Sequence, residues 1–471
     1  MPLAIRTLPL LLALAGCAAG PDYIRQDPAI PADWSVRAAV RNAQEDLSHW
    51  WRQFNDPLLT ELIETALRNS PDLRSARAKL LEVRARHDLA DAGLMPQLGA
   101  SLSTARSKSG DAAPANQFNA GFDASWEIDL FGGLRRTREA AAADAEAAQA
   151  NLHHTQVTLA AEVALNYMQL RSLQDRLQIA EDNLAAQRET LQITEWRAKA
   201  GLVTSMEIEQ ARSNLQQTLA GIPALATSLR KAANRLAVLS GGTPGTLDAR
   251  LSSRVALPPL PDEVALTIPA DTLRQRPDVQ AAERRLAAET ARIGQQAAGS
   301  YPSFTLGGSL GWKSATLGAL GDSASLTRAV SAKLAQTLFD GGRQSSRVAA
   351  QDAVQQQVRI AYEQSVLLAL EEVENALTGY ANSHQRRAAL QQATEAARNA
   401  ALLARQRYEG GLIDFQSVLD IDRTRLSSED GLAGAELEER TALIALYKAM
   451  GGGWSADSAV LRTDTESNRH E

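Results

Sequence analysis

Cysteine and aromatic side chains are both scarce in this sequence. Its 471 residues contain one cysteine, Cys17, so a framework of disulfide bonds is excluded. Aromatic residues make up 4% of the chain, although hydrophobic residues make up 44%. This composition, rich in alanine, is typical of long helices. The formal charge of −6 and the lack of a basic stripe argue against nucleic acid as a partner.

Sequence motifs for catalysis and metal binding are missing as well. The chain has no P-loop, no G-x-S-x-G elbow, no H-E-x-x-H and no CxxC pair. His153 and His154 are adjacent and point to different faces of a helix, and on a helix Asp420 and Asp422 point about 200° apart. We therefore expect no enzyme activity, no catalytic residue and no metal site.

The single cysteine ends a short apolar segment at the N-terminus. Arg6 supplies a positive charge, residues 8–14 are apolar, and Leu-Ala-Gly precedes Cys17. The apolar run is too short to span a bilayer. A signal peptide cut near an incidental cysteine is one interpretation. The segment also resembles a bacterial lipobox, which implies a lipoprotein signal peptide at residues 1–16, a diacylglycerol and an N-acyl chain on Cys17, and, because Ala18 follows, delivery to the outer membrane.

Four landmarks of the first half recur in the same order about one half-chain later, which predicts a tandem internal repeat. They are Pro71-Asp72 and Pro277-Asp278, Met95-Pro96 and Tyr301-Pro302, Phe131-Gly132-Gly133 and Phe339-Asp340-Gly341-Gly342, and Ala200-Gly201-Leu202 and Gly410-Gly411-Leu412.

Each repeat is predicted to contain a helix, a β-hairpin, a very long helix and another helix. Pro223 is expected to kink or interrupt the last helix of the first repeat. The predicted boundaries are an N-terminal strap at 17–54, a first repeat at 55–242 (hairpin 97–130, helices 134–200 and 204–240), a proline-rich joint at 243–270, a second repeat at 271–454 (hairpin 302–339, helices 343–409 and 415–450) and a disordered tail at 455–471.

Strict alternation predicts membrane strands. From Phe118 to Leu130, apolar and polar residues alternate, which indicates a strand with one apolar and one wet face. A soluble sheet packed on helices would show the same pattern, but the lipobox favours a membrane. If the apolar side faces lipid, Asp123, Glu127 and Asp129 face a pore that prefers cations. Four strands per chain cannot close a barrel, so a dimer would supply eight strands and a trimer twelve.

The two longest predicted helices, residues 134–200 and 343–409, contain no proline. Each could reach about 100 Å at about 1.5 Å per residue. Apolar residues in them keep 4-3 spacing, which favours left-handed helix pairing. An antiparallel coiled coil that serves only as a spacer remains an alternative interpretation.

Over nearly its whole length the chain resembles the TolC-like outer-membrane efflux proteins, specifically their NodT-type lipoprotein branch. The resemblance implies a mainly α fold with membrane β: a homotrimer in which a 12-stranded β-barrel continues into a 12-helix periplasmic α-barrel. It also implies passive export of small molecules, together with an inner-membrane pump and a periplasmic adaptor protein. The matching stretches are Trp50-Trp51, Phe54–Leu58, Ser125–Gly132, Arg276–Val279, Ala281–Arg284 and Leu446–Trp454.

The resemblance also assigns residues. Tyr408, Asp420 and Arg423 match the periplasmic gate, for which a solvated charged face is the alternative. Gln416 and Ser417 depart from the family pattern there. The turns at Gly201-Leu202 and Gly411-Leu412 are the expected tips that contact the adaptor. Two other functions stay open at this point: a duct for type I protein secretion, and a lipid-anchored periplasmic spacer without a pore.

Overall fold

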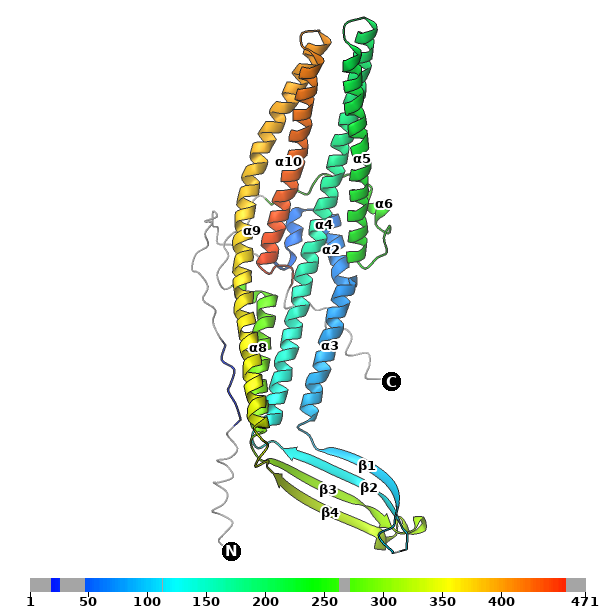
Figure 1. Ribbon diagram of the computed structural model, residues 1–471, viewed down its shortest axis with the longest axis vertical. Coiled ribbons are helices and arrows are strands. Elements are labelled where there is room, and N and C mark those ends of the chain that lie inside the picture. The colour runs from blue at the N-terminus through cyan, green and yellow to red at the C-terminus, as the bar shows by residue number, and fades with distance from the viewer. Residues whose placement is uncertain (1–17, 26–46, 112, 262–271, 455–471) are drawn as a thin grey trace. The chain divides into compact units, whose positions relative to one another are not determined.

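The computed structural model describes residues 18–25, 47–111, 113–261 and 272–454 (Figure 1). These form two compact units, and each unit takes segments from both halves of the chain. Among the described residues, unit 1 contains 18–25, 78–151 and 278–365, and unit 2 contains the rest. The units therefore do not follow the predicted repeats. Cys17, part of the proline-rich joint and the tail at 455–471 lie outside the described residues.

The element order of the first half returns in the second. The order of helix, two strands, long helix and helix predicted from the sequence occurs twice, and both long helices have 67 residues. The first set is α3 (Pro71–Ala92), β1 (Gln97–Ser107), β2 (Ala115–Ile128), α4 (Gly133–Lys199) and α5 (Ser205–Leu239); the second is α8 (Pro277–Ala298), β3 (Ser303–Ser314), β4 (Leu326–Ala335), α9 (Arg343–Glu409) and α10 (Phe415–Ala449). The shorter elements are η1 (Leu47–Phe54), α2 (Pro57–Asn69), α6 (Asp248–Leu251), α7 (Thr272–Gln275), η2 (Leu317–Ala319) and η3 (Ser323–Ser325).

Unit 1 is built around one antiparallel sheet in the order β1-β2-β3-β4, so β1 and β4 are its edges (Figure 1). Residues that pair across an antiparallel ladder point to the same face. The register pairs Ala100 with Phe122, Phe122 with Leu310, and Leu310 with Arg328. The residues on the predicted apolar side of β2 therefore share one face with residues of all three other strands.

The two faces of the sheet differ in chemistry. The apolar face leaves large side chains exposed, among them Leu102, Phe122 and Val330. On the other face, polar side chains bond across strands: Ser101 Oγ donates to Asp123 Oδ2 over 3.1 Å, and Asn119 Nδ2 donates to Ser103 Oγ over 3.2 Å. The sequence-based expectation of one wet and one apolar face is confirmed.

Asp129, expected on the wet face, is instead a helix cap. The strand β2 ends at Ile128, and the Asp129 carboxylate accepts the backbone N–H of Arg135 at 2.8 Å. This N–H is one of the first-turn donors of α4 that have no partner within the helix. Of the three carboxylates predicted to line a pore, Asp123 and Glu127 alone share the polar face of β2.

Arg136 on α4 holds the segment that follows the predicted lipidation site. Its side chain is buried and donates to the Ala19 carbonyl at 3.2 Å and to the Asp22 carboxylate at 2.6 Å. A Cβ at Gly20 would overlap Gly294 Cα on α8, so the segment fits only because both positions are glycine. Residues 18–22 are thus held against α4 and α8.

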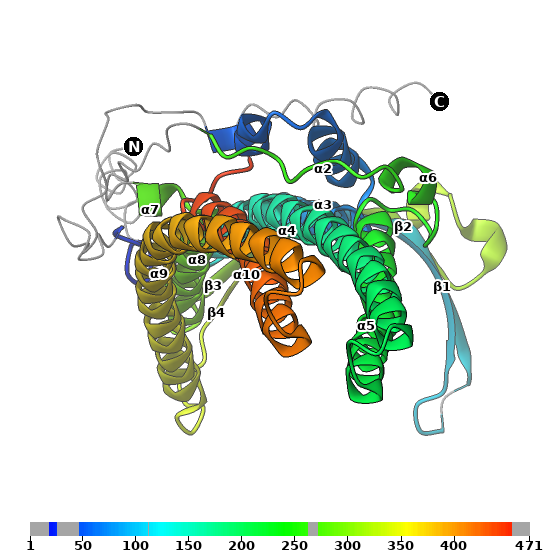
Figure 2. The ribbon, with the colours of Figure 1, turned by 90° about the horizontal axis from the view of Figure 1, so that it is seen from above.

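Unit 2 consists mainly of paired helices, with α5 beside α4 and α10 beside α9 (Figures 1 and 2). The predicted seam of α4 is confirmed, because Leu159, Val163 and Leu170 are buried. Pro223 was expected to kink or interrupt its helix, and the interruption does not occur. The helix α5 continues through Pro223 to Leu239, and a proline inside a helix removes one backbone hydrogen bond.

Residues outside the long helices also pack into unit 2. Leu47–Phe54, assigned from the sequence to the N-terminal strap, forms the short helix η1, whose Trp50 ring stacks on Tyr447 at 5.3 Å. The joint is fixed by Arg171, which donates to the Ser253 carbonyl at 2.8 Å. Within the described part of the chain, no helix combines the length and hydropathy needed to cross a membrane.

Candidate gate site

The two helix hairpins of unit 2 end in turns of identical backbone geometry. Gly201 and Gly411 adopt left-handed φ angles of 71° and 74°, which glycine reaches without strain. In each turn the next residue, Leu202 or Leu412, donates its N–H to a carbonyl five residues earlier, which closes a Schellman motif. Both leucine side chains are largely exposed. The predicted tips are therefore apolar points on rigid turns.

Tyr408 lies on α9 next to the second tip and is buried. Its ring packs against Phe415 of α10, with 5.8 Å between the ring centroids. The guanidinium of Arg197 on α4 lies 4.4 Å above the ring centroid, and Arg197 Nη1 donates to the Tyr408 carbonyl at 2.5 Å. A cation over an aromatic face is attractive. Tyr408 therefore joins the two hairpins of one chain near their tips.

Asp420 and Arg423 lie on the exposed surface of α10, each with 62% of its side chain accessible. Arg423 Nη1 is 3.8 Å from Asp420 Oδ1, and Gln416 Nε2 donates to the same oxygen at 3.3 Å. The spacing of these residues places them in one stripe along the helix. The gate residues predicted on α10 thus lie together, whereas Tyr408 is packed inside the unit.

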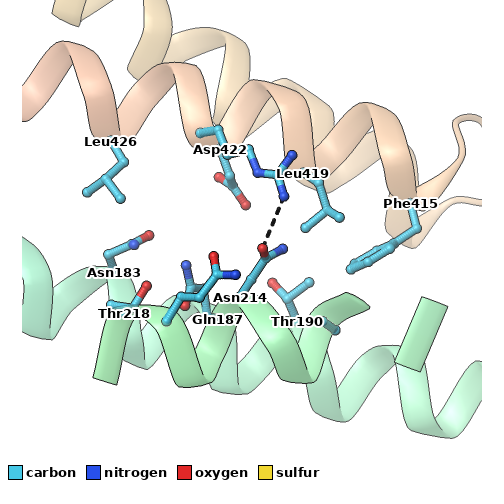
Figure 3. A pocket seen from close by; sticks show the side chains of 12 residues that line it. Asn183, Gln187, Thr190, Asn214, Thr218, Phe415, Leu419, Asp422 and Leu426 are labelled. Atoms are coloured by element: carbon cyan, nitrogen blue, oxygen red, sulfur yellow. Dashed lines mark hydrogen bonds between the residues drawn. The ribbon is translucent and has the colours of Figure 1, made fainter. Parts of the chain in front are cut away.

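A partly open cavity of about 110 Å³, lined by both polar and apolar side chains, lies behind this stripe, between α4, α5 and α10 (Figure 3). Arg423 Nη2 donates to Asn214 Oδ1 of α5 at 3.2 Å across it. The buried amide nitrogen of Asn183 and the amide oxygen of Gln187 have no hydrogen-bond partner among the described residues. A cavity of this size with unpaired polar atoms is suited to hold ordered water. The packing between these helices therefore leaves a space that polar side chains enter.

Asp422 points into the cavity, two residues from the exposed Asp420 (Figure 3). Burial raises the pKa of the Asp422 carboxyl, and the positive charge of Arg425, 3.6 Å away, offsets only part of this shift. The two aspartates have different surroundings, as predicted from their divergence on a helix. No cluster of possible metal ligands occurs within the described ranges.

Arg425 and Glu429 connect α10 to α4 and α9. Arg425 Nη2 donates to Asn183 Oδ1 of α4 at 3.0 Å, and Glu429 accepts Arg398 Nε of α9 at 2.7 Å. Arg425 and Glu429 also bond to each other at 3.0 Å. Charged hydrogen bonds of this kind fix the rotation of α10 about its axis.

Sequence reasoning missed Arg197, Asn214 and Arg425. Part of the signal was present, because Asp422 lies at 4-3 spacing between the buried Leu419 and the partly buried Leu426. A carboxylate in such a stripe needs a cation or water beside it. The cation could have been sought one turn away, at Arg425. The partners on α4 and α5 carry no such local pattern.

Comparison with known proteins gives one consistent result. The profile of the "Outer membrane efflux protein" family matches residues 62–242 and 268–452. The pyoverdine export outer membrane protein OpmQ of Pseudomonas putida is 32% identical over 97% of this chain and 99% of its own length. Nodulation protein T of Rhizobium leguminosarum bv. trifolii is 30% identical over 94% of this chain and 96% of its own length. The solved outer-membrane channel OprN is 36% identical, with a TM-score of 0.88 over 93% of this chain and 100% of its own.

Proposed function

Because this chain belongs to the outer membrane efflux protein family and is an outer-membrane efflux channel that extends into the periplasm, we propose that three copies form one passive exit duct for small molecules. Three four-stranded sheets supply the twelve strands of one barrel, and α4, α5, α9 and α10 of each copy supply twelve periplasmic helices. An inner-membrane pump and a periplasmic adaptor deliver the cargo. The relative named for pyoverdine export supports a small-molecule cargo.

The sheet supplies the observation that carries this proposal. It has one wet and one apolar face, and the outer sides of its edge strands β1 and β4 pair with no other strand among the described residues. A sheet in a membrane must leave no unpaired edge. Since β1 and β4 run antiparallel, β4 of one copy can accept β1 of the next and continue the same alternation. The wet face then lines the lumen and the apolar face contacts lipid.

The gate is the exposed stripe of Gln416, Asp420 and Arg423. In a threefold assembly the stripes of three α10 helices converge on the axis, where carboxylates attract cations and each guanidinium can pair with a neighbouring copy. Opening separates the stripes by moving α10. The partly open cavity behind it permits such movement, because water can replace the hydrogen bond from Arg423 to Asn214.

The proposal also covers how the protein is attached to the membrane and where the adaptor binds. Cys17 carries the lipid, and the hydrogen bonds of Arg136 hold the chain directly after it. The acyl chains anchor the N-terminus at the membrane surface, and the barrel spans the membrane. The exposed Leu202 and Leu412 at the tips are the apolar contacts for the adaptor.

Native mass measurement and planar bilayers test this function. The purified protein is expected to have the mass of three chains and to form ion-conducting channels without added energy. A stable monomer would rule out the shared barrel, and a trimer that conducts nothing would support a spacer. Identification of the co-purified inner-membrane protein then separates a small-molecule pump from a type I secretion system.

A further inference from the structure

Two arginines interrupt the apolar face of the sheet, and both lie on edge strands. Arg328 is on β4, where its register partner is Leu310 of β3. Arg106 is on β1 with the parity of Leu98 and Leu102, and it pairs with Asn116. Both side chains are exposed. Within the described residues, neither has a hydrogen bond or an ion pair with another side chain.

Both arginines lie near the same end of the sheet along the strand direction. β1 follows α3 and β4 precedes α9, so the helical ends of the strands lie at Gln97 and Ala335. Arg106 is the last residue but one of β1, and Arg328 is the third residue of β4. Both therefore lie toward the end remote from the helices. Since the helices extend into the periplasm, this end is on the outer-leaflet side.

An arginine on a lipid-facing surface requires an anionic partner at the membrane interface. The cost of an exposed guanidinium is high at the bilayer centre and small at the interface, which its long side chain can reach. The described strands carry no acidic residue on the apolar face, so the counter-charge must come from outside the chain. A phosphate group suits a guanidinium because it accepts two parallel hydrogen bonds.

We propose that Arg328 and Arg106 of the partner subunit form a binding site for the phosphate groups of the outer-leaflet glycolipid at each junction between subunits. This inference rests on the proposed trimer, in which β4 of one copy pairs with β1 of the next. Such pairing places the two arginines on the same face of adjacent strands. The trimer thus has three sites, and the glycolipid bridges the junctions between its sheets.

The test is native mass spectrometry of the full-length trimer with added lipid A. The wild type is expected to retain up to three molecules, and R106Q/R328Q to bind them at least about tenfold more weakly. The matched control is K313Q/K333Q, which removes two positive charges from the wet face of the same sheet. This control is expected to bind lipid A as the wild type does. Dephosphorylated lipid A is expected to bind weakly to all three proteins.

Three results would overturn the inference: undiminished binding by R106Q/R328Q, equal loss in K313Q/K333Q, or equal retention of dephosphorylated lipid A. If R106Q/R328Q does not assemble, R106K/R328K keeps the charges without the paired hydrogen bonds and is expected to show an intermediate loss; binding as in the wild type would overturn the site. Conductance of the wild type in pure phosphatidylcholine tests the proposed duct separately from the proposed glycolipid site. A conducting trimer that ignores lipid A refutes only the site, whereas a protein that neither assembles nor conducts refutes the duct.

Discussion

Asp420 and Asp422 show how two carboxylates on one helix turn acquire different roles. Asp420 is open to solvent and interacts with Gln416 and Arg423 on the surface of α10. Asp422 lines the cavity, and burial raises the pKa of its carboxyl. The first is suited to attract ions, and the second makes the packing of α10 dependent on pH.

Replacement of Asp422 by asparagine is expected to raise the thermal stability of the protein in detergent at pH 7. The raised pKa means that the folded state binds a proton more readily than the unfolded state, so the ionised carboxylate destabilises the fold above this pKa. The penalty disappears as the pH falls through the folded pKa toward the ordinary value of 3.8. The wild type should therefore approach D422N near pH 4.

Arg425, Arg405 and Glu429 are the charged groups that act on Asp422, and all three are intact in the variant. Asn214→Ala in the same cavity removes no charge and should shift the melting temperature equally at both pH values. A D422N gain that is the same at pH 7 and pH 4 would refute the assignment.

Neutralisation of Asp420 and Arg423 together is expected to raise the conductance in planar bilayers. Loss of an exposed pair worth roughly 0.2–1 kcal/mol changes the ratio of open to closed channels by about 1.4- to 5-fold. Glu209 and Arg212 on α5 form a pair of the same spacing and serve as the control, with no change expected. Unchanged conductance of D420N/R423Q would count against the gate.

At the scale of the element, the curvature of the sheet depends on a pair of glycines. Gly121 and Gly311 are register partners on the wet face. A Cβ at Gly311 would lie 2.5 Å from the Ala120 carbonyl oxygen and 2.7 Å from Gly121 Cα. The two backbones therefore approach closely on the side that the proposed barrel turns inward. Glycine in a strand interior is a common sign of such a bend.

Gly311→Ala is expected to reduce the yield of assembled trimer, because the methyl group meets backbone that cannot move aside. Overpacking of this kind costs about 1–3 kcal/mol. Gly99→Ala on the same wet face is the control, since its Cβ would meet only the Asp123 carbonyl oxygen at 3.9 Å. Size-exclusion chromatography in detergent measures the trimer fraction. Equal fractions for the two variants would show that the close approach is unimportant.

At the scale of the whole molecule, the wet faces of three sheets form the lining of the proposed lumen. Each sheet contributes Asp123 and Glu127. Asp129, which caps α4, contributes nothing to this lining. The ring of charge in the outer part of the duct is therefore smaller than the sequence alone predicted.

Neutralisation of Asp123 and Glu127 together is expected to lower the cation preference of the channel, because rings of carboxylates set the selectivity of cation pores. The reversal potential in a salt gradient measures this preference. Ser309 is the register partner of Asp123, and Ser309→Ala should leave the reversal potential unchanged. A D123N/E127Q channel as selective as the wild type would place these residues away from the lumen.

Much of the fold could be predicted from the sequence because its signals are local. The alternation from Phe118, the 4-3 spacing through Leu159 and Val163, and the glycines of the two tips each lie within one element. Such patterns record which side of a strand or helix is apolar and where the chain turns. They fixed the order and type of the elements, and the two long helices to within one residue at each end.

The tertiary structure alone decided which residues meet. In the sequence, Asp129 continues the alternation of a strand, but in the structure its carboxylate accepts a backbone N–H at the start of α4. Tyr408 is buried because Arg197, more than two hundred residues away, covers its ring. The register of the four strands is needed to show that Arg106 and Arg328 lie on the same apolar face. Periodicity within one element determines the face of a side chain, whereas its partner depends on how distant elements pack, which no local pattern encodes.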